Sequence, residues 1–242
     1  INGNFYRGII TGFNEAFFLD EAKRQELIKA DPRSDEIIKP FLRGKDIKRW
    51  KVQWDGMYLI KTEIGVDIKR YPAVFKHLKQ YQEQLEKRWD KGNHWWELRA
   101  CAYYGEFEKP KIIYPNIFKR ATFAFDQDGY ISNQKAYIIP TGDMALLAIL
   151  NSSLINFWCS YSLAKLQHGY LEPSAIFFQN CPIAKLTADQ KKELVSHVRA
   201  ILDSRNDTSL VKEREAEIDR IVFKIYGLGE GDIKLINSII ID

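Results

Sequence analysis

KIIYPNI at residues 111–117, ATFAFDQDGYIS at 121–132 and KAYIIP at 135–140 follow one another with only short gaps between them. The first is rich in β-branched and aromatic residues, which predicts a strand. The second alternates apolar residues around Asp128-Gly129, and the glycine supplies the positive φ of a tight turn, so it predicts a hairpin. The third predicts a further strand of the same sheet. Together they indicate a twisted, largely antiparallel sheet.

The chain before this run predicts more strands and two helices. A turn at Thr11-Gly12 separates two apolar runs, Pro32 ends a helical segment, and Pro72 suits the first turn of a longer helix whose apolar residues recur at helical spacing. The expected elements are strands at 3–10, 14–20 and 57–62 and helices at 21–30 and 71–89.

Helices dominate the last third of the chain. Leu147, Leu150 and Leu154 share one face of a helix over 144–159. After Pro182 the character changes, and Thr187 with Gln190 matches a capping box. Further helices are expected from about 188 to 202, over 209–226 and over 232–240. The sequence thus predicts a mixed α/β (α+β) fold in two parts, with sheet and packed helices in 1–185 and a C-terminal helical subdomain in 186–242.

Length and composition fit a globular protein of one large domain, or of one domain with an appendage. The chain has 242 residues and three widely spaced cysteines, an odd number that favours free thiols and a cytoplasmic location. No stretch of roughly 18 uninterrupted apolar residues predicts a membrane helix. Because the chain begins at Ile1 and not at methionine, we expect it to be part of a longer protein.

Catalytic signatures are missing from the sequence. The four histidines have no metal-ligand spacing with one another or with cysteine, and no phosphate-binding glycine loop, nucleophile elbow or Asn-Pro-Pro-Tyr methyltransferase motif is present. Glu21 and Lys23 form an ExK triplet of the kind found in metal nucleases, but a solvated helix face explains it better. We therefore expect no catalysis, metal or cofactor in this chain itself.

Positive charge is concentrated in the first part. Residues 1–185 carry 27 basic and 21 acidic side chains, whereas 186–242 carry 9 and 11. The segment 39–51 has six basic residues against Asp46, and its proline, glycine and aromatics indicate a shaped turn and not a simple charged helix. A solvated loop is one interpretation of this segment; contact with the phosphates of a nucleic acid is the other.

Other candidate binding residues are loop cations and amides. Trp95 and Trp96 beside Arg99 suit either core packing or stacking, and Lys119-Arg120 lies between two predicted strands, where such side chains can meet phosphates or base edges. His168 is expected to be an exposed loop residue. The candidate DNA-binding residues are Arg43, Lys45, Lys48, Arg49, Lys61, Arg99, Lys119, Arg120, Asn133, Gln134, Lys135 and His168.

Several blocks in one order resemble a known family. These are GIITGFNEAFFLD, IIKPFLRGKDIKRW, YPAVFKHL, WWELR, KPKIIYPNI, LLAILNSSLINFW and HGYLEPSAIFFQNCPI. They resemble the TaqI-like C-terminal specificity domain of type IIG restriction–modification enzymes and adenine-specific DNA methyltransferases. The resemblance covers nearly the whole chain. It departs at 172–178, where EPSAIFF replaces the more basic and aromatic continuation that such domains have.

The resemblance implies a target recognition domain that reads double-stranded DNA. It places the chemistry upstream in the same chain, in a methyltransferase domain that uses S-adenosylmethionine and takes up a flipped adenine, and in a Mg²⁺-dependent nuclease where the parent protein also cuts. The segment 37–50 then has a scaffold role as well as a charge role. We expect Phe41, Leu42 and Ile47 to anchor it, Asp46 to pair with a neighbouring cation, and its basic side chains to face DNA.

A different function remains open from the sequence. The apolar faces of the C-terminal helices suit a protein-interaction or dimerisation module as well as packing on their own domain. The oligomeric state and the recognised DNA sequence are left open.

Overall fold

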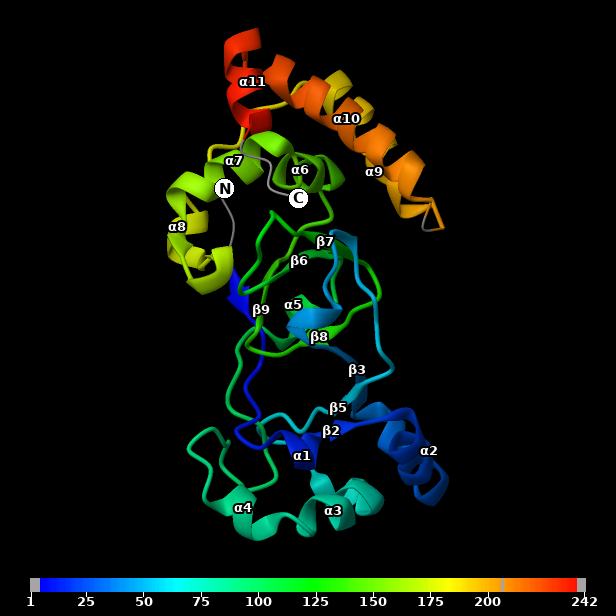
Figure 1. The fold of residues 1–242 in the computed structure, drawn as a ribbon. Helices are drawn as coiled ribbons and strands as arrows, with labels where there is room; N and C mark the ends of the chain where they lie inside the picture. Colours follow the sequence, from blue (N-terminus) through cyan, green and yellow to red (C-terminus); the bar gives the residue numbers. More distant parts are fainter. Residues whose placement is uncertain (1–4, 206, 239–242) are drawn as a thin grey trace.

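The computed structural model describes residues 5–205 and 207–238, which form an elongated molecule in three tiers (Figure 1). The first helices lie at one end, the strands occupy the middle, and the last helices lie at the other end. The mixed α/β architecture with largely antiparallel sheets and C-terminal helices, expected from the sequence, is confirmed.

The larger sheet has five strands in the order β1-β9-β6-β7-β4. Its strands are β1 (Tyr6–Arg7), β9 (Ala136–Ile139), β6 (Lys111–Pro115), β7 (Ala124–Asp126) and β4 (Trp50–Lys51). All neighbours pair antiparallel except β4 and β7, which are parallel. The segment 111–117 therefore supplies the central strand, β6, as its composition predicts.

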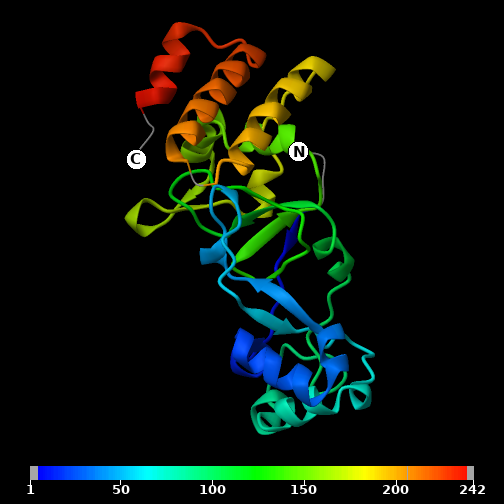
Figure 2. The same ribbon diagram turned by 90° about the vertical axis from the view of Figure 1, so that its right-hand side faces the viewer.

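The second sheet has four strands in the order β2-β5-β3-β8. They are β2 (Phe18–Leu19), β5 (Tyr58–Ile60), β3 (Ile38–Leu42) and β8 (Ile131–Ser132). Only the β3–β8 pair is parallel. A separate two-stranded ribbon pairs β10 (Ala164–Lys165) with β11 (Leu171–Glu172) and projects from the body of the molecule (Figure 2).

Polar side chains cap several helices. Asp20, Asp143, Ser152 and Asp207 accept hydrogen bonds from the first-turn amides, and Thr187 forms the expected capping box with Gln190. The helices are α1 (Asn14–Phe17), α2 (Glu21–Ala30), α3 (Pro72–Lys79), α4 (Gln82–Glu86), α5 (Tyr104–Phe107), α6 (Met144–Leu150), α7 (Ser153–Ser162), α8 (Ala175–Phe178), α9 (Ala188–Leu202), α10 (Thr208–Ile225) and α11 (Glu230–Ser238), with 3₁₀ turns at Pro32–Glu36, Gly44–Asp46, Ile68–Arg70 and Gln167–Gly169.

The five-stranded sheet separates two hydrophobic cores. Ile113 of β6 faces the core that includes the second sheet and α1–α3, while its neighbours Ile112 and Tyr114 face the core formed with α6, α7, α9 and α10. Side chains alternate between the faces of a strand, so burial on both faces explains the unbroken apolar run. Leu194 of α9 and Val222 of α10 complete the second core. The division of the chain near residue 185 stays a prediction.

The hairpin expected over 121–132 is wrong. Gly129 does adopt a positive φ of 76°, but β7 pairs with β6 and β4 while β8 joins β3 in the other sheet. The chain crosses from one sheet to the other at this turn. The alternation of apolar residues within 121–132 cannot show which strands β7 and β8 pair with. The strand expected over 14–20 is also largely wrong, because 14–17 form the short helix α1.

Two expected helices are broken. The 144–159 helix divides into α6 and α7, since the Asn151 side chain exchanges two hydrogen bonds with the Phe123 backbone and Ser152 caps α7. The 71–89 helix divides after Lys79 and ends at Glu86. Trp89, expected on its apolar face, is fully exposed. Trp95 and Trp96 lie outside any helix, and both pack half-buried against Phe75.

A fully buried ion pair fixes one end of β6 to β7. Lys111 Nζ lies 2.5 Å from Asp126 Oδ2, and neither side chain is exposed. Burial lowers the pKa of Lys111 and raises the pKa of Asp126, against the attraction between them. Lys111 also donates to the Phe107 carbonyl, and Asp126 accepts from the Asp128 amide.

Replacing Asp126 by Asn will destabilise the chain, because it leaves the Lys111 ammonium buried without a counter-charge. We expect a loss of about 3–5 kcal/mol in the free energy of unfolding, measured by urea denaturation. Asp128→Asn, two residues away and exposed, is the matched control and should change little. The double variant Lys111→Met/Asp126→Leu should recover most of the loss; a double variant as unstable as Asp126→Asn would contradict the electrostatic explanation.

Candidate nucleic-acid interface

The turn after β3 is anchored to the core as the sequence predicts. Phe41 and Leu42 are completely buried, and Ile47 is nearly so. The buried Asp46 carboxylate accepts from the Arg43 backbone amide at 2.8 Å and from its guanidinium at 3.2 Å, which closes the 3₁₀ turn. Arg43 also binds Asp55, and this hydrogen bond lowers the pKa of Asp55. The expected pairing of Asp46 with a neighbouring cation is confirmed.

The turn at 133–135 is the junction where several candidate segments meet. A Cβ on Gly44 would lie 2.8 Å from the Lys135 carbonyl oxygen. Only glycine therefore lets the basic turn, residues 43–46, lie this close to the 133–135 turn. Asn116 donates to that same oxygen at 2.8 Å. From the other side, Arg7 Nε donates to the Gln134 carbonyl at 3.1 Å. The basic turn, the 116–120 loop and β1 are thus neighbours.

The 116–120 loop also contacts the β10–β11 ribbon. Phe118 and Leu171 exchange two backbone hydrogen bonds, at 3.1 and 2.8 Å. The adjacent Lys119 ammonium lies 5.3 Å from the centre of the Tyr170 ring, a cation–π contact on the surface. His168 is exposed at the tip of the ribbon with φ 60°. A line of contacts therefore runs from β1 through 133–135 and 116–120 to the ribbon.

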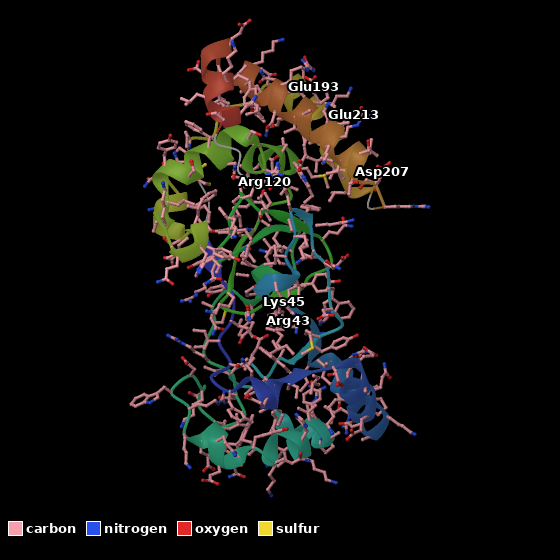
Figure 3. All side chains as sticks on the ribbon, in the orientation of Figure 1. Arg43, Lys45, Arg120, Glu193, Asp207 and Glu213 are labelled. Carbon is pink, nitrogen blue, oxygen red and sulfur yellow. The ribbon has the colours of Figure 1, made fainter. Side chains whose placement is uncertain are left out.

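Glu215 of α10 ties this region to the C-terminal helices. Its Oε1 accepts from Arg49 Nε at 2.6 Å and from Trp50 Nε1 at 2.5 Å, and its Oε2 lies 3.4 Å from Arg120 Nη2. Burial alone would raise the pKa of Glu215, but the attraction and hydrogen bonds of Arg49 outweigh it, so the net pKa is lowered. Figure 3 shows Arg120 beneath the C-terminal helices and Arg43 and Lys45 nearer the middle of the molecule.

Arg49 is committed to internal partners. Besides Glu215, its guanidinium donates to the Ala121 carbonyl at 2.8 Å and to both the side-chain and backbone oxygens of Asn151. Burial lowers its pKa. With these acceptors occupying the guanidinium, Arg49 joins the basic segment to α6 and α10, and does not project from the surface as expected.

Most of the other predicted cations are also paired. Lys61 lies mostly buried between Glu63 and Glu108. Arg99 pairs with Asp90 at 3.0 Å, yet lines a cavity of about 270 Å³ together with Arg7. Lys45 lies 3.6 Å from Asp55, and both side chains are more than 60% exposed. Of the amides, Asn133 accepts from the Lys135 amide, and Gln134 is half-buried.

Three predicted cations have no acidic partner in the described part of the chain. They are Lys48, Lys119 and Lys135, all exposed. Sequence reasoning missed Arg7 and Lys165, which are also exposed and lack an acidic partner among the described residues. Arg7 is the one cation in the first predicted strand, and Lys165 adjoins the predicted LQHGYLEP turn. These two positions in the sequence were the signals that could have identified Arg7 and Lys165 as candidate binding residues.

Several acidic side chains lie on the C-terminal helices, where Glu193 and Glu213 pair with Arg220 and Arg214. Figure 3 places Glu193 on α9, and Asp207 and Glu213 on the α10 side of the helical tier. Within the described residues, no three His, Cys, Asp or Glu side chains gather as a metal site requires.

No single helix of 5–205 or 207–238 is long and apolar enough to cross a membrane; α6 and α7 meet that test together, but they are bent by 58° at their break.

The sequence profile of the TaqI-like C-terminal specificity domain matches residues 39–183. The chain belongs to this family. The match spans the basic turn, the 116–120 loop, the 133–135 junction and the ribbon, so every part of the described surface except β1 lies inside the specificity domain proper. The resemblance inferred from the ordered sequence blocks is confirmed.

Three restriction–modification proteins are similar to this chain, one in sequence and two in fold. The type II methyltransferase M.MjaIV of Methanocaldococcus jannaschii is 25% identical over 232 residues, 89% of this chain and 76% of that protein. The type IIL restriction–modification enzyme MmeI, solved in complex with DNA, superposes with a TM-score of 0.74 at 16% identity over 99% of this chain. The type IIG restriction endonuclease BpuSI gives 0.54 at 17% identity over 94%. The chain covers 36% and 31% of those two structures.

Replacing Glu215 by Gln will destabilise the specificity domain, because Arg49 is left charged and largely buried. We expect a loss of about 3 kcal/mol in the free energy of unfolding at pH 7, measured by urea denaturation. Glu213→Gln, on the same helix but 62% exposed, should stay close to wild type. Equal stability of the two variants would contradict the role of Glu215 as the junction.

The cost of losing Glu215 will depend on pH. Its pKa in the folded chain is lowered from the ordinary 4.5, so its contribution is complete above that value and is lost as the pH falls through the lowered one. The difference between wild type and Glu215→Gln should therefore be constant from pH 7 to about pH 5 and shrink below about 4.5. Urea denaturation at several pH values measures it; a difference that grows on acidification would contradict the assignment.

Proposed function

We propose that this chain recognises a specific sequence in double-stranded DNA as the target recognition domain of a restriction–modification enzyme or adenine-specific DNA methyltransferase. The observation that carries the proposal is the continuous line of segments bearing unpaired cations, within a domain of the specificity family. A polyanion attracts such a surface through counterion release, while cations already bound to internal carboxylates add little.

The proposal gives different roles to different residues. Lys48, Lys119 and Lys135 contact phosphates and set the register of the domain on the duplex. Gln134 and His168, whose side chains can both donate and accept hydrogen bonds, are the candidates for base edges, since an amide suits adenine in the major groove. Lys61 and Arg49 serve the scaffold.

The parent protein would supply the chemistry. Because the chain spans only about a third of MmeI and BpuSI, a methyltransferase domain elsewhere in the parent would bind S-adenosylmethionine and receive the flipped adenine, with this chain holding the duplex against it in the cytoplasm. A Mg²⁺-dependent nuclease domain is part of the proposal only for a parent that also cuts. An Asn-Pro-Pro-Tyr motif in the remaining parent sequence would support this arrangement.

An interaction or dimerisation module using the C-terminal helices is less favoured. Leu194, Val198, Ile218 and Val222 of α9 and α10 are buried in the second core and are not presented to a partner. The apolar faces that suggested this function are thus covered by α6, α7, β4 and each other.

Removing the unpaired cations will weaken DNA binding in proportion to the phosphates they contact. In the full-length protein, Lys48→Ala, Lys119→Ala and Lys135→Ala should each reduce the slope of log affinity against log salt by about 0.9, measured by fluorescence anisotropy with a 24-base-pair duplex. Lys76→Ala and Lys79→Ala, exposed on α3 at the far end, are the matched controls. Binding by wild type with the same slope in all three variants would contradict the interface.

A further inference from the structure

The β10–β11 ribbon and α7 enclose a cavity of about 410 Å³ that the site described above does not include. Its lining contains Lys119, Asn156, Tyr161, Lys165 and Leu166. The cavity lies beside the backbone hydrogen bonds between the 116–120 loop and the ribbon, at the ribbon end of the line of contacts. No carboxylate is among its described lining residues.

Asn156 presents hydrogen-bond donors to this cavity. The side chain is only 9% exposed, and its Oδ1 accepts from the Ala121 backbone amide at 2.8 Å. That bond fixes the orientation of the amide and turns the NH₂ group away from Ala121. Among residues 5–205 and 207–238, the NH₂ group has no hydrogen-bond acceptor. The NH₂ group is therefore available to a ligand with acceptor oxygens in the cavity that Asn156 lines.

The charged groups that line the cavity favour the same kind of ligand, one with hydrogen-bond acceptors. Lys119 and Lys165 both lack an acidic partner in the described part of the chain, and an ammonium group offers donors only. Two ammonium groups and a fixed NH₂ group around one cavity favour an anion with several oxygens. Tyr161 and Leu166, respectively 66% and 42% exposed, add apolar surface at the same place. Phosphate oxygens joined to an apolar sugar ring match this combination.

The ribbon above the cavity has the shape of a groove-reading element. His168 and Gly169 have φ values of 60° and 77°, and these two left-handed residues reverse the chain tightly between β10 and β11. The result is a narrow two-stranded projection (Figure 2) with exposed Gln167 and His168 at its tip. The major groove of B-form DNA admits a two-stranded ribbon, which then lies beside the phosphates of one strand.

We propose that this cavity binds one phosphate and its deoxyribose from a DNA strand, and so holds the tip of the ribbon in the adjacent major groove. Lys119, Lys165 and the NH₂ group of Asn156 donate to the phosphate, and Tyr161 and Leu166 contact the sugar. The inference rests on the proposed function, and it adds Asn156, Tyr161, Lys165 and Leu166 to Lys119, the one residue of this set that the sequence analysis named.

Asn156→Asp tests the donor role directly. The substituted carboxylate keeps an acceptor for the Ala121 amide but replaces the NH₂ donors with an anionic oxygen facing the phosphate. In the full-length protein, with a 24-base-pair duplex, we expect affinity to fall at least roughly tenfold while the thermal unfolding temperature stays close to wild type. Lys165→Ala should weaken binding and reduce the salt slope by at most about 0.9, the contribution of one phosphate. Lys192→Ala, exposed on α9, is the control and should bind as wild type.

The outcomes separate the two proposals. If wild type shows no salt-dependent affinity for the duplex, the proposed function fails and the inference with it. If wild type binds, and both Asn156→Asp and Lys165→Ala keep its affinity and salt slope, the cavity is not a phosphate site, while DNA recognition stands. Should Asn156→Asp unfold the chain, Lys165→Ala and a Lys119→Ala/Lys165→Ala double variant decide: weaker binding with a slope reduced by about 0.9 in the double variant, the contribution of one phosphate, supports the cavity, and an unchanged slope overturns it.

Discussion

The candidate interface depends on the hydrogen bonds of one mostly buried carboxylate, that of Glu215. It joins the basic segment, through Arg49 and Trp50, to α10, and it faces Arg120 of the next loop. Trp50 has a φ of 76°, a conformation that costs a bulky residue about 1–3 kcal/mol. Its indole bond to Glu215 and its backbone bond to Phe123 offset this cost. The helical tail therefore shapes a surface that lies almost entirely outside it.

Local rules predicted those parts of the molecule whose causes are local. The burial of Phe41 and Leu42, the capping box at Thr187 and the end of α2 before Pro32 each follow from a few neighbouring residues. The central strand β6 was evident because its run is apolar on both faces. The family resemblance rested on the order of such blocks along the sequence. It could be recognised without knowing which distant segments contact one another in the fold.

The errors come from partners far apart in the chain. β7 and β8 alternate as a hairpin should, yet β8 pairs with β3 and β7 pairs with β6. The 144–159 pattern breaks because Asn151 bonds to Phe123, 28 residues away, and Arg49 turns inward because Glu215 lies 166 residues further on. Composition counts cations but cannot show which of them an internal carboxylate has already bound.

The cations of the candidate interface fall into three groups with different physical consequences. Arg49 is held by a mostly buried carboxylate, and releasing it would leave an unpaired charge, which is strongly unfavourable. Lys45 and Asp55 are paired at 3.6 Å with both side chains largely exposed, and such pairs contribute only about 0–1 kcal/mol, so a phosphate can replace the carboxylate at little cost. Lys119 and Lys165 need no exchange at all. The net charge of +5 in residues 39–51 therefore overstates the positive charge that this segment can present to DNA, because internal carboxylates already bind part of it. The ribbon has fewer cations, but its Lys165 has no acidic partner in the described part of the chain.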